Sequence, residues 1–319
     1  MAKPEDITVE DKANQWDRIV SANDPLEIAN KAVIARYVYA TNLLDLDSFD
    51  GYVVEDYVEH DPIPGQAPGR DGLKDAYRIF GGPFPDAVFV FADIIAEGDI
   101  VFGRGEISGT HIGEFFGIPG SGKKVEWTGT RLFRLRDLKV TDGWFNVDMV
   151  SLLQQMGAIP GWEDRPATPS MPMGAAGTRE ASRQIMRRLI EEVWAEGKLE
   201  VADELFHPEA ICPSAPTLPL GPQGTKEIVQ TVRTAFPDYW VKIELMAAER
   251  DRVAARLVQG GTHDGEFFGL APTGRTVTWT EMAMLRIGDG QILATWFDSD
   301  IAGLMQQLGA GDEQAAASA

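Results

Sequence analysis

The chain has 319 residues, of which 44% are hydrophobic and 24% charged, and its formal net charge is −20 at pH 7. This length exceeds the usual size of one hydrophobic core, so we expect two domains. The negative charge repels phosphate backbones and anionic lipids, which argues against nucleic acid and the membrane surface as partners and leaves neutral organic substrates.

Cellular location is indicated by two further features of the sequence. No apolar run approaches the roughly 20 residues that span a bilayer, and residues 1–20 lack the apolar core of a signal peptide. Cys212 is the single cysteine, which excludes an intramolecular disulfide. We therefore expect a protein of the reducing cytoplasm.

Taken in chain order, the sequence predicts helices followed by strands, and it does so twice. Apolar residues recur at spacings of three and four in the helical segments, whereas the later segments read as strands. The helices of the first copy are predicted over 28–44, 45–53 and 70–80, and its strands over 86–98, 99–115, 123–137 and 138–153. The helices of the second copy are predicted over 178–197, 198–206 and 222–236.

A repeat explains this doubling. The stretch GTHIGEFFG at 109–117 returns as GTHDGEFFG at 261–269, 152 positions later. The register holds without a gap between 84–157 and 236–309, with 29 identities in 74 positions. A gapless register of this length indicates a duplicated domain.

The repeat and the composition between its copies predict the domain organisation. We expect an N-terminal extension (1–24), domain 1 (25–158), a Pro/Gly-rich linker (159–177), domain 2 (178–311) and a disordered tail (312–319). Helices followed by an antiparallel meander give an α+β domain. A strongly bent sheet over those helices forms a cone, and the pocket inside it is the natural place for chemistry.

This order of elements, the GTHxGEFFG motif, the W-F-x-x-D stretch and the closing QQxG resemble the SnoaL-like polyketide cyclases of the nuclear transport factor two-like superfamily. The resemblance implies two tandem cone-shaped α+β barrels, each a curved antiparallel sheet wrapped around N-terminal helices. Because the domain is duplicated without a gap and a Pro/Gly-rich linker joins the copies, we expect them to pack as an intramolecular pseudo-dimer. The resemblance also implies acid/base catalysis without a metal or an organic cofactor. The family's catalytic Asp matches Asp148 and Asp300, and its pocket His matches His111 and His263.

The last strand of each copy carries these Asp residues. By alternation, Trp144, Asn146 and Asp148 share one face, predicted to point into the pocket. The matching set in copy two is Trp296, Asp298 and Asp300. A carboxylate beside a tryptophan in an apolar cone would exchange protons near neutrality. The alternative is that Asp148 caps the following helix. For His111 too, two interpretations stay open: it contacts a substrate oxygen, or it pins the loop by hydrogen bonds to the backbone.

The two copies differ at positions that would contact a substrate. His60 aligns with Cys212, Asp61 with Pro213, and Arg131 with Ala283, so copy one has the fuller polar set. The residues predicted to bind substrate are His60, Asp61, Trp127, Arg131, Trp144, Asn146, Trp279, Trp296 and Asp298. Trp127 and its counterpart Trp279 are expected to belong to the core or the pocket wall and not to a cofactor platform.

These observations predict a cofactor-independent enzyme of the cyclase, lyase or isomerase type that acts on a small apolar organic substrate. The predicted reaction is aldol-type ring closure, or the reverse C–C cleavage, of an aromatic or polyketide-like carbonyl or hydroxyl compound. An epoxide hydrolase or dehydratase, or a non-catalytic binding protein, is the alternative. The four histidines have no metal-ligand spacing, and homo-oligomers beyond the pseudo-dimer remain open.

Overall fold

The structure is a computed structural model that describes residues 24–159 and 168–309. The chain separates into two compact units, Met1–Trp162 and Glu163–Ala319. We call their described parts domain 1 and domain 2 and describe each by itself. The predicted N-terminal extension, most of the linker and the C-terminal tail lie outside the described residues. The end of the linker is described, and its Ala175 carbonyl accepts a hydrogen bond from Asp289 N–H at 2.9 Å.

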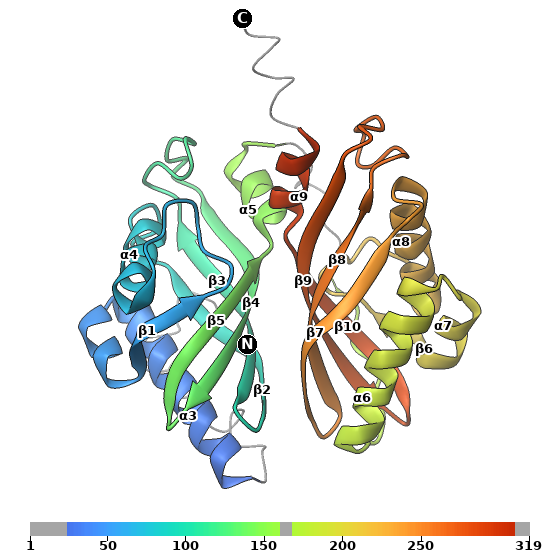
Figure 1. The fold of residues 1–319 in the computed structure, drawn as a ribbon, viewed down its shortest axis with the longest axis horizontal. Coiled ribbons are helices and arrows are strands. Elements are labelled where there is room, and N and C mark those ends of the chain that lie inside the picture. The colour runs from blue at the N-terminus through green and yellow to red at the C-terminus, as the bar shows by residue number, and fades with distance from the viewer. Residues whose placement is uncertain (1–23, 160–167, 310–319) are drawn as a thin grey trace, which may run out of the picture. The chain divides into compact units, whose positions relative to one another are not determined.

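Domain 1 begins with helices and continues with a meander of strands, coloured blue to green in Figure 1. Its helices are α3 (Pro25–Leu43), the 3-10 helix η2 (Leu46–Gly51), α4 (Gly69–Gly81) and α5 (Met149–Met156). Its strands are β1 (Val53–Glu59), β2 (Val88–Glu97), β3 (Ile100–Thr110), β4 (Lys124–Arg136) and β5 (Lys139–Val147).

Domain 2 repeats this order, coloured yellow-green to red in Figure 1. Its helices are α6 (Arg179–Arg188), the π-helical segment η3 (Leu189–Ala195), α7 (Glu200–Leu205), α8 (Pro222–Ala235) and α9 (Ile301–Leu308). Its strands are β6 (Phe206–Ile211), β7 (Trp240–Glu249), β8 (Arg252–Thr262), β9 (Thr276–Gly288) and β10 (Gln291–Ser299).

The sheets confirm the predicted α+β class and correct two of its details. The strand order is β1-β5-β4-β3-β2 in domain 1 and β6-β10-β9-β8-β7 in domain 2. Four strands of each sheet form the expected antiparallel meander, but the first strand joins the last one in parallel. Each sheet is therefore mixed, and within the described residues its two edges do not pair to close a barrel. The short strand β1 escaped prediction because the acidic residues of VVEDYVE interrupt the apolar alternation.

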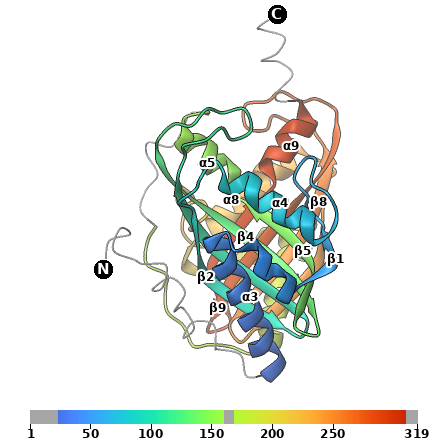
Figure 2. The ribbon, with the colours of Figure 1, turned by 90° about the vertical axis from the view of Figure 1, so that its left-hand side faces the viewer.

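The helices of domain 1 lie across one face of its sheet. Figure 2 looks onto α3 and α4 with the strands behind them. Buried apolar side chains from α3, η2 and β1 pack against β2, β3, β4 and β5 in one cluster. A second cluster gathers under α5 at the other end of the sheet. The space between the helices and the sheet is where a ligand can enter.

Two further predictions concern the chain as a whole. Among the described helices, none is long and apolar enough to cross a bilayer. The packing of the two domains as a pseudo-dimer stays a prediction, because each domain is described here by itself.

Candidate functional site

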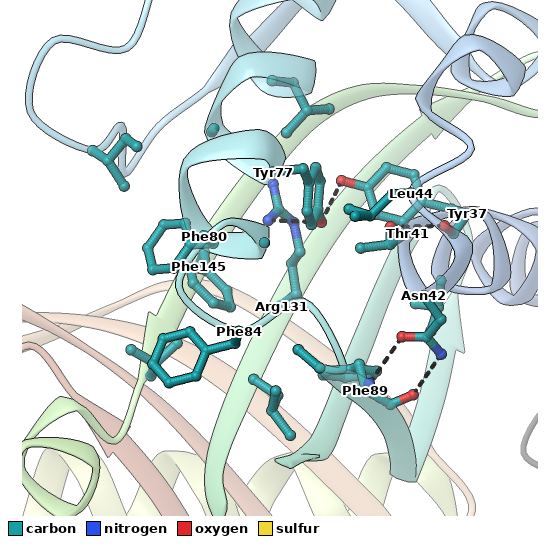
Figure 3. Close-up of a pocket in the computed structure, with 18 of the residues that line it drawn as sticks. Tyr37, Thr41, Asn42, Leu44, Tyr77, Phe80, Phe84, Phe89, Arg131 and Phe145 are labelled. Carbon is teal, nitrogen blue, oxygen red and sulfur yellow. Dashed lines mark hydrogen bonds between the residues drawn. The ribbon is translucent and has the colours of Figure 1, made fainter. Parts of the chain in front are cut away.

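Domain 1 encloses a cavity of about 160 Å³ between α3, α4 and the sheet (Figure 3). Most of its wall is aromatic or aliphatic. The apolar lining consists of Val38, Leu44, Ile63, Leu73, Ala76, Phe80, Phe84, Pro85, Ala87, Phe89, Phe91, Ile107, Trp127, Phe133, Phe145 and Val147. The polar lining consists of Tyr37, Thr41, Asn42, Glu59, Asp61, Gln66, Tyr77 and Arg131. An apolar cavity with a few convergent polar groups is the usual form of a small-molecule site.

Arg131 is the centre of the polar wall. It extends from β4 and donates hydrogen bonds to Glu59, to Tyr57 Oη at 3.1 Å and to Tyr77 Oη at 3.3 Å. Tyr57 also donates to Glu59 at 2.8 Å. The negative charge of Glu59 and the nearby phenols outweigh the effect of burial and raise the pKa of Arg131, so the guanidinium stays charged inside the domain.

The absence of a side chain at Gly143 leaves the space in which the Tyr57 hydroxyl reaches Arg131 and Glu59. A Cβ atom at position 143 would lie 1.9 Å from Tyr57 Oη and 3.3 Å from an Arg131 nitrogen. Any side chain there would displace the phenol from the ion pair. Domain 2 has Thr295 at the corresponding position.

Tyr37 and Tyr77 provide a hydroxyl proton for a ligand. Their Oη atoms are 2.8 Å apart, on α3 and α4 (Figure 3). Burial raises the pKa of Tyr37 well above that of a free phenol, although Arg131 acts to lower it. One of the two hydroxyl protons makes the hydrogen bond between them, and the other is not used by it. The pair can therefore donate to an oxygen bound in the cavity.

Asp61 places a carboxylate near the same wall. Its Oδ2 atom accepts a hydrogen bond from Phe145 N–H at 3.0 Å. Phe145 is the cross-strand partner of Arg131, and its ring lies 5.3 Å from the Arg131 guanidinium carbon. Domain 1 thus combines a carboxylate with a cation and phenol donors, as proton removal next to a carbonyl requires.

The prediction of which face of β5 points into the cavity is wrong. The alternation is as predicted, but Phe145 and Val147 line the cavity, and Trp144 and Asn146 lie on the other face. The register that places Arg131 on the helix side of β4 places its partner Phe145 on the helix side of β5. Asp148 follows the end of β5 and caps α5, accepting hydrogen bonds from the backbone N–H of Ser151 at 3.0 Å and from the Ser151 hydroxyl.

His60 lies outside the cavity with Trp144. Their ring centroids are 4.2 Å apart and nearly parallel. His60 Nε2 is 3.0 Å from Asp142 Oδ1. Burial acts to raise the pKa of Asp142, but the hydrogen bonds from His60 and Thr141 outweigh it and lower that pKa.

His111 and His263 occupy equivalent places and pin the following loop. Both are fully buried. His111 Nδ1 accepts from Ser121 N–H at 3.3 Å, and His263 Nδ1 accepts from Thr273 N–H at 3.3 Å. Each histidine also binds the far side of its loop through its backbone. Neither ring lines its domain's cavity, which matches the loop-pinning interpretation.

The remaining predicted residues are in domain 2. Trp279 is buried in the core, with its ring 5.2 Å from that of Phe236. Asp300 caps α9 by accepting from Gly303 N–H at 2.8 Å. Asp298 is buried but does not line the domain 2 cavity, whereas Trp296 does. The predicted set is therefore divided: Asp61, Trp127, Arg131 and Trp296 line cavities.

Sequence reasoning missed the partners of Arg131. Tyr37, Glu59 and Tyr77 become Leu189, Ile211 and Val229 when the 152-residue shift is applied. Arg131 shows the same loss of polarity, since it corresponds to Ala283, so this signal in the sequence could identify all three. Among the described residues, no cluster of three or more His, Cys, Asp or Glu side chains could hold a metal ion.

Comparisons with known proteins agree with this architecture. The model of the family described as SnoaL-like polyketide cyclase matches residues 31–156 and again 184–308. Aklanonic acid methyl ester cyclase AcmA of Streptomyces galilaeus is 34% identical over 129 residues, which cover 39% of this chain and 88% of that protein.

Solved structures similar to part of the chain include the following two. Wild-type IdmH from Streptomyces antibioticus is 32% identical, with a TM-score of 0.37, and the match covers 40% of this chain and 98% of IdmH. TsrD from Streptomyces laurentii is 25% identical, with a TM-score of 0.39, and the match covers 41% of this chain and 96% of TsrD.

Proposed function

Because the chain belongs to the SnoaL-like polyketide cyclase family, we propose that domain 1 catalyses ring closure of a polyketide-like carbonyl compound by intramolecular aldol addition. The family and the relative named as a cyclase support a cyclase-type function. The observation that carries the finer proposal is the convergence of Asp61, Arg131 and the Tyr37–Tyr77 pair on one apolar cavity.

Each group has a defined task in this proposal. Asp61 removes a proton from the carbon next to a substrate carbonyl. The resulting enolate oxygen accepts hydrogen bonds from the phenol pair, and the Arg131 charge stabilises it in a site with little water. The enolate carbon then attacks a second carbonyl of the same molecule, forming one C–C bond, and the new alkoxide takes the proton back from Asp61. The product is an isomer of the substrate, and the same groups serve the reverse cleavage.

Glu59 and Tyr57 are positioning residues in this mechanism. They hold the guanidinium of Arg131 in one orientation from the side of β1. The apolar wall binds the hydrocarbon part of the substrate. A cavity of about 150 Å³ accommodates a benzene ring, so the 160 Å³ cavity has room for the ring that closes.

The first prediction tests Asp61 against Asp148. With aklanonic acid methyl ester as the trial substrate, we expect a ring-closed isomer that chromatography separates from the starting ester. Asp61→Asn should lower kcat by about 10²–10⁴-fold because it removes the proton acceptor and keeps the shape. Asp148→Asn keeps the helix cap and should retain the turnover of the wild type.

The outcome separates two assignments. Full turnover by Asp61→Asn would remove Asp61 from the mechanism. A large loss in Asp148→Asn would return the proton transfer to the residue that the family resemblance indicates. Melting temperatures of both variants serve as the control for folding.

A further inference from the structure

Domain 2 has its own cavity, of about 50 Å³, between α8, η3 and the sheet. It occupies the place in its domain that the larger cavity occupies in domain 1. Its lining comprises Leu189, Ile190, Trp194, Phe206, Ala210, Ile211, Cys212, Leu218, Pro219, Gly221, Gly224, Thr225, Ile228, Glu281, Ala283, Leu285, Thr295, Trp296 and Phe297. The Arg131 network has no counterpart in it, since apolar residues replace Tyr37, Glu59, Tyr77 and Arg131.

Another corner has undergone the opposite change. Gly129 of domain 1 corresponds to Glu281, and its apolar neighbours Ile107, Val147 and Ala87 correspond to Gln259, Ser299 and Tyr239. A Cβ atom on Gly129 would lie 3.3 Å from Ile107 and 3.4 Å from Val147. Their counterparts Gln259 and Ser299 are hydrogen-bond partners of Glu281. The four positions therefore form an apolar corner in domain 1 and a polar network in domain 2.

The hydrogen bonds of this network have a consistent direction. The Tyr239 hydroxyl donates to Gln259 Oε1, so the Gln259 amide group faces Glu281 and donates to its Oε2 atom at 3.4 Å. The Ser299 hydroxyl donates to the same oxygen. Burial raises the pKa of Glu281 and outweighs the hydrogen bonds from Ser299 and Gln259, which act to lower it; the charge of Asp298 adds a smaller rise. With both donors on Oε2, a protonated Glu281 carries its proton on Oε1.

The cavity offers no positive charge to a ligand. None of the residues that line it is Lys or Arg. Cys212 is held as a neutral thiol, because burial raises its pKa and outweighs a hydrogen bond with Thr295. An anionic ligand would lose its hydration without gaining a counter-ion. With Glu281 protonated, the cavity selects a neutral ligand with an oxygen that accepts a hydrogen bond.

The volume limits the size of that ligand. A water-sized group needs about 10–15 Å³ of such a cavity. The 50 Å³ of domain 2 therefore holds about four such groups. An aromatic ring does not fit, in contrast to the cavity of domain 1.

We propose that domain 2 holds a second site, which binds a small neutral carbonyl compound through a hydrogen bond donated by the Glu281 carboxyl group. This site is separate from the cyclisation site of domain 1, and it does not depend on the function proposed there. Cys212, Thr295 and Trp296 form the wall beside the bound carbonyl compound.

The test is a titration of the full chain with acetone, which matches the cavity in size. Nuclear magnetic resonance spectra monitor the backbone amide signals and the indole N–H signals. Acetone should shift the signals of Cys212, Thr295 and Trp296. Acetate, of nearly the same shape but negatively charged, should leave them unchanged. Glu281→Met should weaken acetone binding by about tenfold, because it removes one hydrogen bond and keeps the chain length. Acetone should shift the signals of Cys212, Thr295 and Trp296 in Asp61→Asn, a variant of the domain 1 cavity, as it does in the wild type.

A second measurement covers the case in which Glu281→Met fails to fold. Infrared spectra of the wild type should contain the carbonyl stretch of a neutral carboxyl group, which acetone shifts and which Glu281→Gln lacks. The proposal is overturned if acetone leaves the domain 2 signals in place, if Glu281→Met binds acetone equally well, or if acetate binds in preference to acetone.

Discussion

At the scale of single residues, the main feature of domain 1 is a buried charge that is held in place by its neighbours. The side chains of Arg131 and Glu59 are only 11% and 8% exposed. The guanidinium carbon of Arg131 also lies 5.7 Å from the centre of the Tyr77 ring and 5.6 Å from that of Phe133. A cation in such a place is stable only while its partner carries the opposite charge.

The second prediction follows from this pair. Glu59→Gln leaves the charge of Arg131 buried without compensation and should lower the free energy of unfolding of domain 1 by about 3–5 kcal/mol. Adding Arg131→Met should restore part of the loss, because the double variant buries no charge. Urea denaturation measures both. If the double variant is no more stable than Glu59→Gln, uncompensated charge is not the cause.

At the scale of elements, the loop after β3 and its counterpart after β8 are each organised around one buried histidine. The His111 ring holds Ser121 N–H, and its backbone N–H and carbonyl bind Lys123 and Gly122. Since both repeats keep this arrangement, the loop structure accounts for the repeated GTH motif.

The third prediction concerns this loop. His111→Ala should speed hydrogen exchange at the amides of Ser121 and Gly122, because they lose the ring and its packing. Domain 2 provides an internal control in the Thr273 amide, which His263 still holds. The kcat of ring closure should fall far less than in Asp61→Asn. A loss as large as that of Asp61→Asn would indicate that His111 takes part in the chemistry.

The fourth prediction concerns Asp238, which lies just before β7 and accepts hydrogen bonds from Thr262 at the end of β8. The backbone N–H of Thr262 and then its hydroxyl lower the pKa of Asp238. A carboxyl whose folded pKa is lowered stabilises the fold above its unfolded pKa of about 3.9 and loses this effect as the pH falls through the folded value. Asp238→Ala should therefore be less stable than the wild type at pH 7, and the difference should shrink in acid below pH 4. A difference in melting temperature that does not change with pH would contradict this.

At the scale of the whole molecule, one duplicated fold carries two different cavities. Domain 1 has the larger one, with a fixed cation and phenol donors, and domain 2 has the smaller one, with a carboxyl group whose pKa burial raises. The shared core positions and the 152-residue register preserve the fold. The polar groups on the cavity walls differ between the domains, because a few side chains in a pocket can differ without altering the packing around it.

The fifth prediction is that the two domains pack on each other through their sheets as a pseudo-dimer. It depends on the gapless repeat and on the Pro/Gly-rich linker between the two copies. Cross-linking followed by mass spectrometry should join lysines of the two sheets within one chain. An experimental structure in which the two sheets share no contact would refute it.

The sequence by itself determined the features that depend on local order. The repeat, the succession of helices and strands, and the alternation along β5 were all readable, because helical spacing, strand alternation and the 152-residue register are properties of neighbouring residues. The helix-capping role considered for Asp148 was also local. The chemical candidates Asp61 and Arg131 emerged from comparing the two copies.

Only the tertiary structure decided which face of β5 points toward the helices. Alternation defines two sets of residues but does not say which one is inside, and the pairing of Arg131 with Phe145 settles that question. The network of Tyr37, Glu59, Tyr77 and Arg131 joins α3, β1, α4 and β4, which are distant in the chain. Such a site has no sequence spacing to recognise, because it forms only when helices and sheet close over the same space.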